Sequence, residues 1–565
     1  MFKLRFSLVF ILLTVAITGL SSQSPQWDWA IGAGGMGHDQ VQGLAVDASG
    51  NQYITGNFYG NIEIGGCPIT GNGYANVFVA KLDPMGNCLW AVSAGDTLMD
   101  RGLDIALDAE GNVCITGTYM GTVSFGGTTL SSSGSSDIFV AKLDNAGNWL
   151  WARSAGGLAE TSYIPPEQSN AIATDSDGNV LISGFFTGPV SFGPFELSSY
   201  YSPEFQYFSK DMFVAKLDSN GNWLWAVASS STGWAEGRSM ITDNGGNACV
   251  VGHFGRPTTF GDDTLTSVNN DYDIFVSKLS PTGTWLWTVS ASGLGQDLGA
   301  DIALGPANTL YITGSFKYPI SFGAIELAQQ DVYRQLVAKL DSEGNWLWAV
   351  PLGGLHTQNN DAFITVDEHG NAYMTGVFWG DVPFGATTLT SAGSFDTYVA
   401  KMDPAGNLLW ALRAGGPDRD YGMGIGLDDL GKARIGGFFV ESATFGNTVL
   451  TGDANGGTNI FVATVGGAVP VSDAVIPAGS SSMLYPVWPN PLGKNGKLNV
   501  PARVAERETA TISIYNIRGQ LLASRQLSPG DQHLELNMAA HPTGVYFCRL
   551  HTSTTDMVRR FVVMK

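Results

Sequence analysis

The sequence predicts an all-β protein whose main body is a seven-bladed β-propeller with four strands per blade. Three observations lead to this prediction: a hairpin that carries Trp, its recurrence at a near-constant period, and complementary strands left over at the two ends of the repeats. Only 14% of the 565 residues are charged and 73 are Gly. This composition favours short strands joined by tight turns.

The repeating unit is a predicted β-hairpin, seen most clearly between Asp137 and Gly157. An apolar run, 138–143, is followed by a turn in which Gly147 can take positive φ, and then by a second run that begins at Trp149. The last Trp of this hairpin recurs at spacings of 61, 61, 74, 62, 61 and 62 residues, at Trp29, Trp90, Trp151, Trp225, Trp287, Trp348 and Trp410. Such a period indicates a repeat array.

Each repeat contains four predicted strands, which we call A, B, C and D. In the second repeat they are 102–107, 112–118, 137–143 and 149–154. A β-solenoid is the alternative, but its coils are commonly about 20–30 residues long and need no paired hairpins. The repeats begin with a lone D strand at 27–35 and end with an A-B-C set that finishes at 459–465. We therefore expect the N-terminal strand to complete the last blade and close the ring.

The segments outside the repeats have their own signatures. Residues 1–22 have a basic start and an apolar core too short to span a bilayer, which predicts a cleaved secretory signal peptide. The propeller is predicted over 23–467 and a linker rich in Ala, Val, Ser and Pro over 468–484. Short strands over 485–565 predict a small Ig-like β-sandwich. No later stretch is long and apolar enough for a membrane helix.

Charge and residue spacing exclude some classes of function. The net charge of the whole chain is −21, of which the repeats carry −27 against +2 before them and +4 in residues 472–565. This acidic body argues against a nucleic-acid partner. The seven His show no metal-ligand spacing, and there is no G-x-S-x-G motif, so we expect no enzyme. Cys114 and Cys249 occupy an apolar slot of their repeats and are expected to be buried thiols. The sequence leaves a Cys67–Cys88 disulfide open.

Antiparallel alternation separates two ends of every blade. The A–B and C–D turns lie at one end, here called the turn end, and the longer B–C and D–A connections lie at the other, the loop end. An acidic residue recurs where six of the seven D–A connections enter strand A, at Asp39, Asp100, Glu167, Glu236, Asp297 and Asp420, and Asn359 stands at the remaining one. If A is the innermost strand, these carboxylates ring the mouth of the central channel and could bind Ca²⁺ or a cationic ligand. The alternative is that each carboxylate caps backbone amides of its own loop or of the neighbouring blade.

The third repeat is longer than the others and carries an aromatic B–C connection, with Tyr200, Tyr201, Phe205 and Tyr207. Exposed aromatic rings suit the stacking of a sugar or a peptide. A locally packed loop is the alternative interpretation.

Two signatures in the repeats resemble a known family. The G-L-D-I-A-L-D-x-x-G-N run from Gly102 and the D-I-F-V-A-K-L-D-x-x-G-N-W-L-W-A run from Asp137 look like bacterial SBBP β-propeller repeats. This resemblance implies the fold and no single activity. A weaker likeness of Ala141–Trp151 to quinoprotein propellers is interpreted as Trp packing between blades.

The C-terminal residues resemble the sorting domain of type IX secretion. The motifs are Trp488–Pro491, Ile512–Gly519, Pro542–Phe547 and Arg560–Lys565. The sorting residues implied by the resemblance are Pro489, Asn490, Pro491, Gly519, Gly544 and Lys565. The resemblance also implies the type IX machinery as a partner, and a location outside a Gram-negative cell or on its surface.

Together these features predict a secreted or cell-surface propeller that acts as a non-catalytic binding module, with a glycan or a surface protein as its partner. The alternative is an extracellular carbohydrate-active hydrolase or lyase that uses carboxylates of the loop end. No cofactor is expected apart from Ca²⁺ at the acidic ring, and no metal-ligand set is identified.

Overall fold

The computed structural model describes residues 25–157, 167–204, 207–328, 332–355, 362–453, 456–466, 483–484, 497–504, 509–518, 520–538, 541–552 and 556–563. These ranges are all-β, with no α-helix and two short 3₁₀ turns, η1 (Val268–Asn270) and η2 (Pro306–Asn308). The chain divides into two compact units, residues 1–468 and 469–565. The predicted signal peptide and most of the predicted linker lie outside the described residues.

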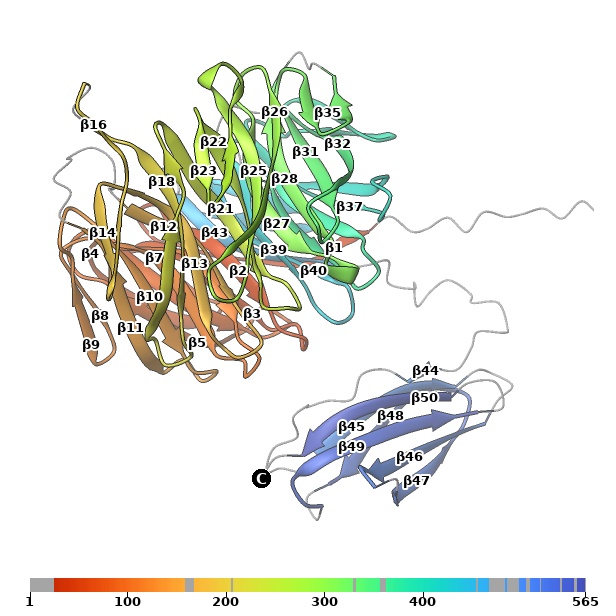
Figure 1. Ribbon diagram of the computed structural model, residues 1–565. Helices are drawn as coiled ribbons and strands as arrows, with labels where there is room; N and C mark the ends of the chain where they lie inside the picture. The colour runs from red at the N-terminus through yellow and green to blue at the C-terminus, as the bar shows by residue number, and fades with distance from the viewer. Residues whose placement is uncertain are drawn as a thin grey trace, which may run out of the picture. The chain divides into compact units, whose positions relative to one another are not determined.

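The first unit consists of four-stranded antiparallel sets arranged about a common axis (Figure 1). Set by set, in the order A to D, the strands are β2 (Gln40–Val46), β3 (Gln52–Ile64), β4 (Cys67–Leu82) and β5 (Cys88–Ala94); β6 (Arg101–Leu107), β7 (Val113–Tyr119), β10 (Asp137–Leu143) and β11 (Trp149–Ala155); β12 (Glu167–Thr174), β13 (Val180–Thr187), β18 (Lys210–Leu217) and β19 (Trp223–Ala228); β21 (Trp234–Thr242), β22 (Ala248–Gly255), β25 (Tyr272–Leu279) and β26 (Trp285–Gly293); β27 (Leu298–Leu304), β28 (Leu310–Phe316), β31 (Arg334–Leu340) and β32 (Trp346–Leu355); β33 (Phe363–Val366), β34 (Ala372–Phe378), β37 (Asp396–Met402) and β38 (Leu408–Ala414); β39 (Asp420–Leu427), β40 (Ala433–Val440), β43 (Thr458–Gly466) and β1 (Gln26–Ala33).

The A strands are innermost and follow one another around the axis. Contacts run from β2 to β6, β12, β21, β27, β33 and β39, and β39 in turn contacts β2. The N-terminal strand β1 pairs antiparallel with β43, with Trp27 opposite Val465 and Ala33 opposite Ile460. The unit is therefore an all-β, propeller-like array whose first strand lies in the same sheet as its last A-B-C set.

Neighbouring sets are joined by the Trp that recurs in strand D. The indole N–H of Trp90 donates to the carbonyl of Asn145, 3.0 Å away in the next C–D turn, and Trp151 makes the same bond to Ser219. Gly147 of that turn has a φ of 86°, and a Cβ there would lie 2.8 Å from the Trp90 ring. The turn therefore requires Gly both for its backbone conformation and for the Trp that packs on it.

The B–C connections, expected as loops, contain short hairpins in several repeats. In the second repeat β8 (Thr122–Phe125) pairs with β9 (Thr128–Ser131), and Phe125 packs edge-on against Trp149 with 5.0 Å between ring centroids. The other short strands are β14 (Pro189–Phe192), β15 (Phe195–Ser198), β16 (Tyr201–Ser202), β17 (Tyr207–Phe208), β20 (Ser230–Ser231), β23 (Thr258–Phe260), β24 (Asp263–Leu265), β29 (Ile320–Phe322), β30 (Ile325–Leu327), β35 (Asp381–Phe384), β36 (Thr387–Thr390), β41 (Ser442–Phe445) and β42 (Thr448–Thr451). The recurring Phe-Gly pair is thus a tight turn whose Phe anchors the hairpin to strand D.

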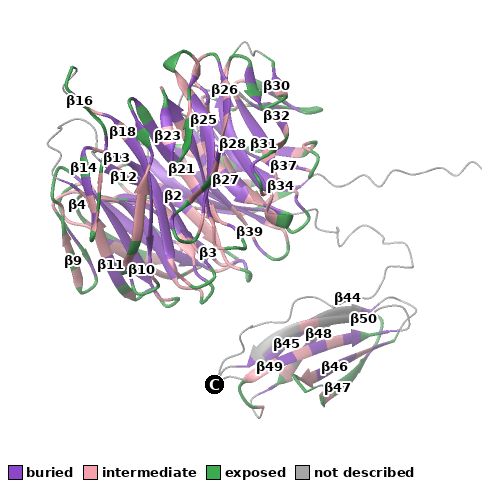
Figure 2. Ribbon diagram, in the orientation of Figure 1, coloured by how far each residue is buried: buried purple, intermediate pink, exposed green. Residues whose placement is uncertain are grey.

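The hydrophobic core lies between successive sets (Figure 2). One cluster joins Val77 and Val79 of β4 to Ile115 of β7 and Phe139 of β10. All seven residues of β10 are buried, because both faces of the strand pack against neighbouring sheets. Each set is therefore stabilised mainly by the sets on either side of it.

The cysteines divide between one disulfide and buried thiols. Cys67 and Cys88 form a disulfide that joins β4 to β5. Cys114 and Cys249 are free and fully buried, as expected, and Cys548 is also a buried thiol. The question that the sequence left open is thus answered in favour of the bridge.

The second unit is a small two-sheet sandwich. One sheet contains β44 (Met483–Leu484), β45 (Lys497–Val504) and β48 (Gly530–Asn537). The other contains β47 (Leu521–Leu527), β46 (Ala510–Asn516), β49 (Gly544–His551) and β50 (Asp556–Val563). Leu498 and Leu534 of the first sheet share a core with Ile514 and Cys548 of the second. This arrangement is that of a β-sandwich.

Candidate functional site

The acids predicted to ring the channel mouth are buried in the structure. Asp39, Asp100, Glu167, Asp297 and Asp420 have no exposed surface, and Glu236 is 8% exposed. None of them lines the axial pocket. The prediction that these carboxylates form an open rim is therefore corrected. The acids lie where the connection that leaves strand D passes strand C of the same set. Binding of a ligand by these residues stays a prediction.

Asp39 and Asp100 cap backbone N–H groups, as the alternative interpretation of the acidic positions predicts. Asp39 accepts the backbone N–H groups of Gly35 and Tyr59, both at 2.8 Å. Asp100 accepts those of Asp96 and Met120, at 3.0 and 3.3 Å. These carboxylates hold the D–A connection against the B strand. Burial raises the pKa of Asp39, and it raises that of Asp100 to about 7.

Glu167, Asp297 and Asp420 differ in having a second acid at the start of strand C. Burial, together with a second acid at the start of the preceding C strand, raises the pKa of Glu167 to about 8, that of Asp297 to about 9 and that of Asp420 to about 8. The second acids are Asp137, Asp273 and Asp396. Desolvation and a like-charged neighbour both favour the neutral form of a carboxyl group.

Glu236 stands one place later in its strand and joins a different network. Its Oε1 accepts bonds from Arg238 Nη1 at 3.0 Å and Asn170 Nδ2 at 3.1 Å, and its Oε2 accepts one from Lys210 at 3.1 Å. Burial alone would raise the pKa of Glu236, but Arg238, His253 and Lys210 outweigh it and hold the pKa at about 2. Glu236 therefore stays ionised and fixes the positions of Arg238 and Asn170.

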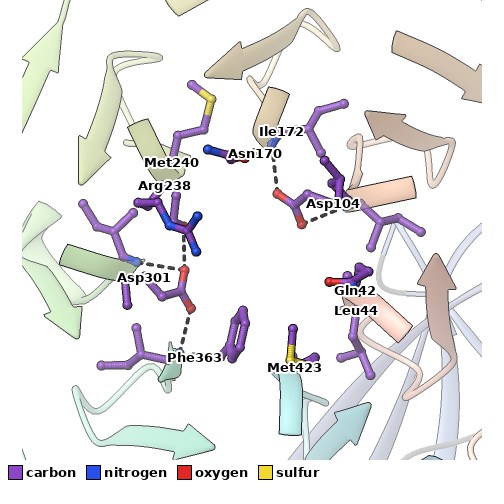
Figure 3. A pocket seen from close by; sticks show the side chains of 18 of the residues that line it. Gln42, Leu44, Asp104, Asn170, Ile172, Arg238, Met240, Asp301, Phe363 and Met423 are labelled. Carbon is purple, nitrogen blue, oxygen red and sulfur yellow. Dashed lines mark hydrogen bonds between the residues drawn. The ribbon is translucent and has the colours of Figure 1, made fainter. Parts of the chain in front are cut away.

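The inner strands enclose a pocket of about 360 Å³ on the axis (Figure 3). One aliphatic side chain from each inner strand forms an apolar ring in it: Leu44, Ile105, Ile172, Met240, Ile302, Ile364 and Ile425. The polar lining is uneven around the axis and comes from Gln42, Asp104, Gln168, Asn170, Arg238, Ser239 and Asp301. An apolar pocket with a few placed polar groups is the usual form of a small-molecule site.

The two pocket acids tie neighbouring inner strands together. Asp104 accepts the N–H of Ile105 at 2.8 Å and that of Ile172, on the next inner strand, at 2.9 Å. Asp301 likewise accepts the N–H of Ile302 at 2.9 Å and that of Ile364 at 2.7 Å. In Figure 3 they stand on opposite sides of the pocket. Burial raises the pKa of Asp104 to about 7.

Sequence reasoning missed Asp104 and Asp301, although a signal was available. They occupy the same place in the second and fifth repeats, where other repeats have Gly43, Ala171 or Phe363. An Asp within an otherwise apolar predicted strand needs a buried partner. The partners are amides next to a β-bulge, which the strand prediction did not include.

The aromatic connection of the third set is partly packed on itself. Tyr200 and Tyr201 are 47% and 45% exposed, and Tyr201 lies 4.9 Å from the ring of Phe208. Tyr207 belongs to the two-residue strand paired with β16. Phe205 lies outside the described residues.

The structure exposes further aromatic residues that the sequence did not predict as candidate binding residues. Within the described part of the propeller-like unit the strongly exposed rings are Tyr74, Tyr200, Tyr201, Trp234, Tyr318 and Trp379. Tyr74 lies in the first half of β4, before that strand pairs with β5. The other rings belong to B–C or D–A connections or to the strand ends beside them, so all lie at the loop end. Several are backed by a second ring, as Tyr74 is by Tyr59 at 5.4 Å and Trp234 by Tyr272 at 6.1 Å.

No group of three or more His, Cys, Asp or Glu suited to a metal ion occurs among the described residues. The Asp residues of the D-x-x-G turns bind their own turns. Asp144, for example, accepts the N–H groups of Ala146 and Asn148, both at 2.9 Å. Calcium at the acidic positions stays a prediction.

Residues 486–564 match the family described as "Secretion system C-terminal sorting domain". This match indicates a secreted or cell-surface protein that uses the type IX machinery. Of the predicted sorting residues, Gly544 begins β49, whereas Pro489, Asn490, Pro491, Gly519 and Lys565 lie outside the described residues. In the part of the chain that the structure describes, no helix has the length and apolar character of a membrane span.

The chain has relatives of low similarity. The chain is 23% identical over 441 residues to an uncharacterized WD repeat-containing protein of Acanthamoeba polyphaga mimivirus, over 63% of this chain and 31% of that protein. It is 31% identical over 129 residues to the regulatory protein FlaEY of Caulobacter vibrioides, over 22% of this chain and 13% of that protein. The chain thus spans less than a third of either relative. The β-propeller domain of the trilobed protease from Pyrococcus furiosus is similar at 8% identity and a TM-score of 0.32, over 77% of this chain and 97% of that one.

Proposed function

We propose that the first unit is a closed seven-bladed propeller of SBBP repeat type, exported by the type IX pathway, which acts as a non-catalytic binding module for a glycan at its loop end. The A-to-D sets, the pairing of β1 with β43 and the contact of β39 with β2 support the blade count and the closure. The sorting domain supports export.

One observation carries the binding role: the strongly exposed aromatic rings of the described unit gather at the loop end. A Trp or Tyr ring in water is free to stack on the apolar face of a sugar while its edge remains solvated. Trp379 is 55% exposed, and behind it Phe395, Tyr421 and Phe438 continue as a run of ring contacts, with Tyr421 and Phe438 stacked at 5.0 Å. The turn end offers exposed Met85 and Leu430 instead.

Binding is favoured over hydrolysis because the pocket carboxylates are already engaged. Each of Asp104 and Asp301 accepts backbone N–H bonds from two inner strands. A glycosidase needs one carboxyl group to give up a proton and another to attack or to activate water. Carboxyl groups that hold two strands together are better suited to a structural role than to proton donation or nucleophilic attack.

The test is a glycan-array screen of the full chain, followed by titration of the best array glycan into Trp379→Ala and Met85→Ala variants. We expect Trp379→Ala to weaken binding about tenfold, the effect of removing an aromatic anchor worth roughly 1.4 kcal/mol. Met85→Ala, an exposed apolar change at the turn end, is the matched control and should bind as the parent does. An array without binding, or equal losses in the two variants, would contradict the proposal.

A further inference from the structure

Three junctions between neighbouring sets bring two buried carboxyl groups together. At each junction an acid that opens strand C stands beside the acid that precedes the next strand A. The pairs are Asp137 with Glu167, Asp273 with Asp297, and Asp396 with Asp420. All six side chains are at most 2% exposed.

These pairs contain buried carboxylate oxygens that form no hydrogen bond with the described residues, although the backbone N–H of Gly293 lies near Asp297 and that of Val440 near Asp420. These oxygens are Asp137 Oδ1, Glu167 Oε2, Asp396 Oδ1, Asp420 Oδ1 and both oxygens of Asp297. Ionised carboxylates only accept hydrogen bonds, so two of them side by side cannot satisfy each other. A single proton makes one group a donor to the other and removes one of two buried negative charges.

At two other junctions the residue at the start of strand C, where the acid pairs have Asp137, Asp273 or Asp396, is an Asn. Asn76 stands at this position before Asp100. Asn459 stands at it beside Asp39, whose N–H donates to Thr458 O at 3.0 Å where the first strand joins the last set. There the remaining carboxylate has both oxygens bonded to backbone N–H groups. The uncharged Asn side chain thus avoids a second negative charge at these two junctions. At the acid pairs a bound proton would have the same effect.

Other polar groups face the pairs. Asp271 lies near both Asp297 and Asp273. The Arg413 guanidinium donates to Asp396 Oδ2 at 3.0 Å, and Asp418 lies near Asp420.

The remaining pair faces hydroxyl groups. Ser154 donates to Asp137 Oδ2 at 3.5 Å, and the Tyr119 hydroxyl lies close enough to the pair to interact with it.

We propose that each acid pair holds one shared proton at neutral pH, and that loss of these protons weakens the junctions of the loop end as the pH rises. The protons make Asp137–Glu167, Asp273–Asp297 and Asp396–Asp420 pH-sensitive clamps between neighbouring sets. Backbone bonds from Asp297 N to Tyr272 O at 2.7 Å and from Asp420 N to Phe395 O at 2.7 Å place the clamps where the D–A connections meet strand C.

The raised pKa values agree with this geometry and give the sign of the effect. The pKa of Glu167 and of Asp420 is about 8 and that of Asp297 about 9, against ordinary values near 4. A folded-state pKa above the unfolded one means that the stabilisation is complete below the unfolded pKa. It is lost as the pH rises through the folded pKa values.

The experiment measures the melting temperature of the full chain between pH 5 and pH 9 for the parent and Asp297→Asn. We expect the parent to lose several degrees between pH 7 and pH 9. Asp297→Asn, which copies the amide–acid junctions, should lose less and melt above the parent at pH 9. Asp420→Asn is the second variant and should behave in the same way if Asp297→Asn does not fold.

Asp100→Asn is the matched control, because its junction already carries Asn76. Because burial raises the pKa of Asp100 to about 7, the effect of this substitution on the melting temperature should be constant only above that value, and it should be similar at pH 8 and pH 9. In addition, the infrared band of neutral carboxylic acid should be present in the parent at pH 7 and weaker in Asp297→Asn. Two results would overturn the proposal: parallel curves of melting temperature against pH for the parent and Asp297→Asn, or the absence of the infrared band. Restoration of the parent melting temperature at pH 9 by millimolar Ca²⁺ would also overturn it, because a cation and not a proton would then occupy the pairs.

Discussion

The two ends of the propeller-like unit use the same residue type in opposite ways. At the turn end Asp108 lies 2.8 Å from Lys142, and Asp175 lies 2.8 Å from Lys216. Burial tends to raise the pKa of these carboxyl groups, but the Lys and the Asn of the turn outweigh it and lower the pKa. At the loop end an acid such as Asp297 meets a second acid, and its pKa rises. The partner, and not burial alone, decides the charge of a buried carboxyl group.

The ends also differ in what they expose. The turn end repeats one D-x-x-G design closed by its own amides, and little there distinguishes one set from the next. The loop end varies from set to set and carries Trp234, Trp379 and the other strongly exposed rings of the described residues. We infer that the turn end supplies stability and the loop end supplies recognition, and the following changes test this division.

The largest expected effect is that of Trp151→Ala at the turn end. Trp151 is 8% exposed, packs on Gly221 and donates its indole N–H to Ser219. Its loss should lower the free energy of unfolding by about 4 kcal/mol, through the cavity and the missing bond. Trp151→Phe, which keeps a ring, should lose less. Equal unfolding midpoints for Trp151→Ala and the parent in guanidinium would break the division.

Lys142→Met should have an intermediate effect, about 2 kcal/mol, because it leaves the buried Asp108 carboxylate without its cation. Asn112 still donates to Asp108, which keeps the loss moderate. The pKa of Asp108 is lowered in the fold, so its contribution is present above the unfolded pKa and is lost as the pH falls through the folded pKa. The difference from the parent should therefore be full at pH 7 and shrink below about pH 4. Urea titrations at pH 7 and pH 3.5 measure it, and a difference that grows on acidification would refute the assignment.

The smallest expected effect is that of Asp144→Ala in a C–D turn, about 1 kcal/mol, comparable with the loss of a capping side chain. The carboxylate accepts two backbone N–H groups and the Asn148 side chain, all at 2.9 Å. Asp144→Asn keeps the oxygen that accepts the backbone bonds and should be nearly neutral. Thermal unfolding of both variants and the parent measures the effect. If the Asn variant loses as much as the Ala variant, the negative charge matters more than the turn geometry.

The strands of the second repeat agree with the sequence prediction to within about one residue, because their signals are local. Alternating apolar residues and the Asp and Gly of each turn act over two to five positions. The Phe125 hairpin was missed because its anchor, Trp149, is more than twenty residues away. The sequence analysis identified the acidic positions but did not predict that they are buried. No local sequence feature near Asp297 indicates that Asp273 is its neighbour in the fold.

Strand order, turn positions, the buried Cys slots and the Trp period could thus be read from the amino-acid sequence, because each depends on interactions within one repeat or on its periodic recurrence. The environment of Glu236, the inter-strand bonds of Asp104 and Asp301, and the gathering of exposed rings at one end emerged only in three dimensions. Those features join residues of different repeats, and the electrostatic free energy of a buried charge depends on everything that surrounds it.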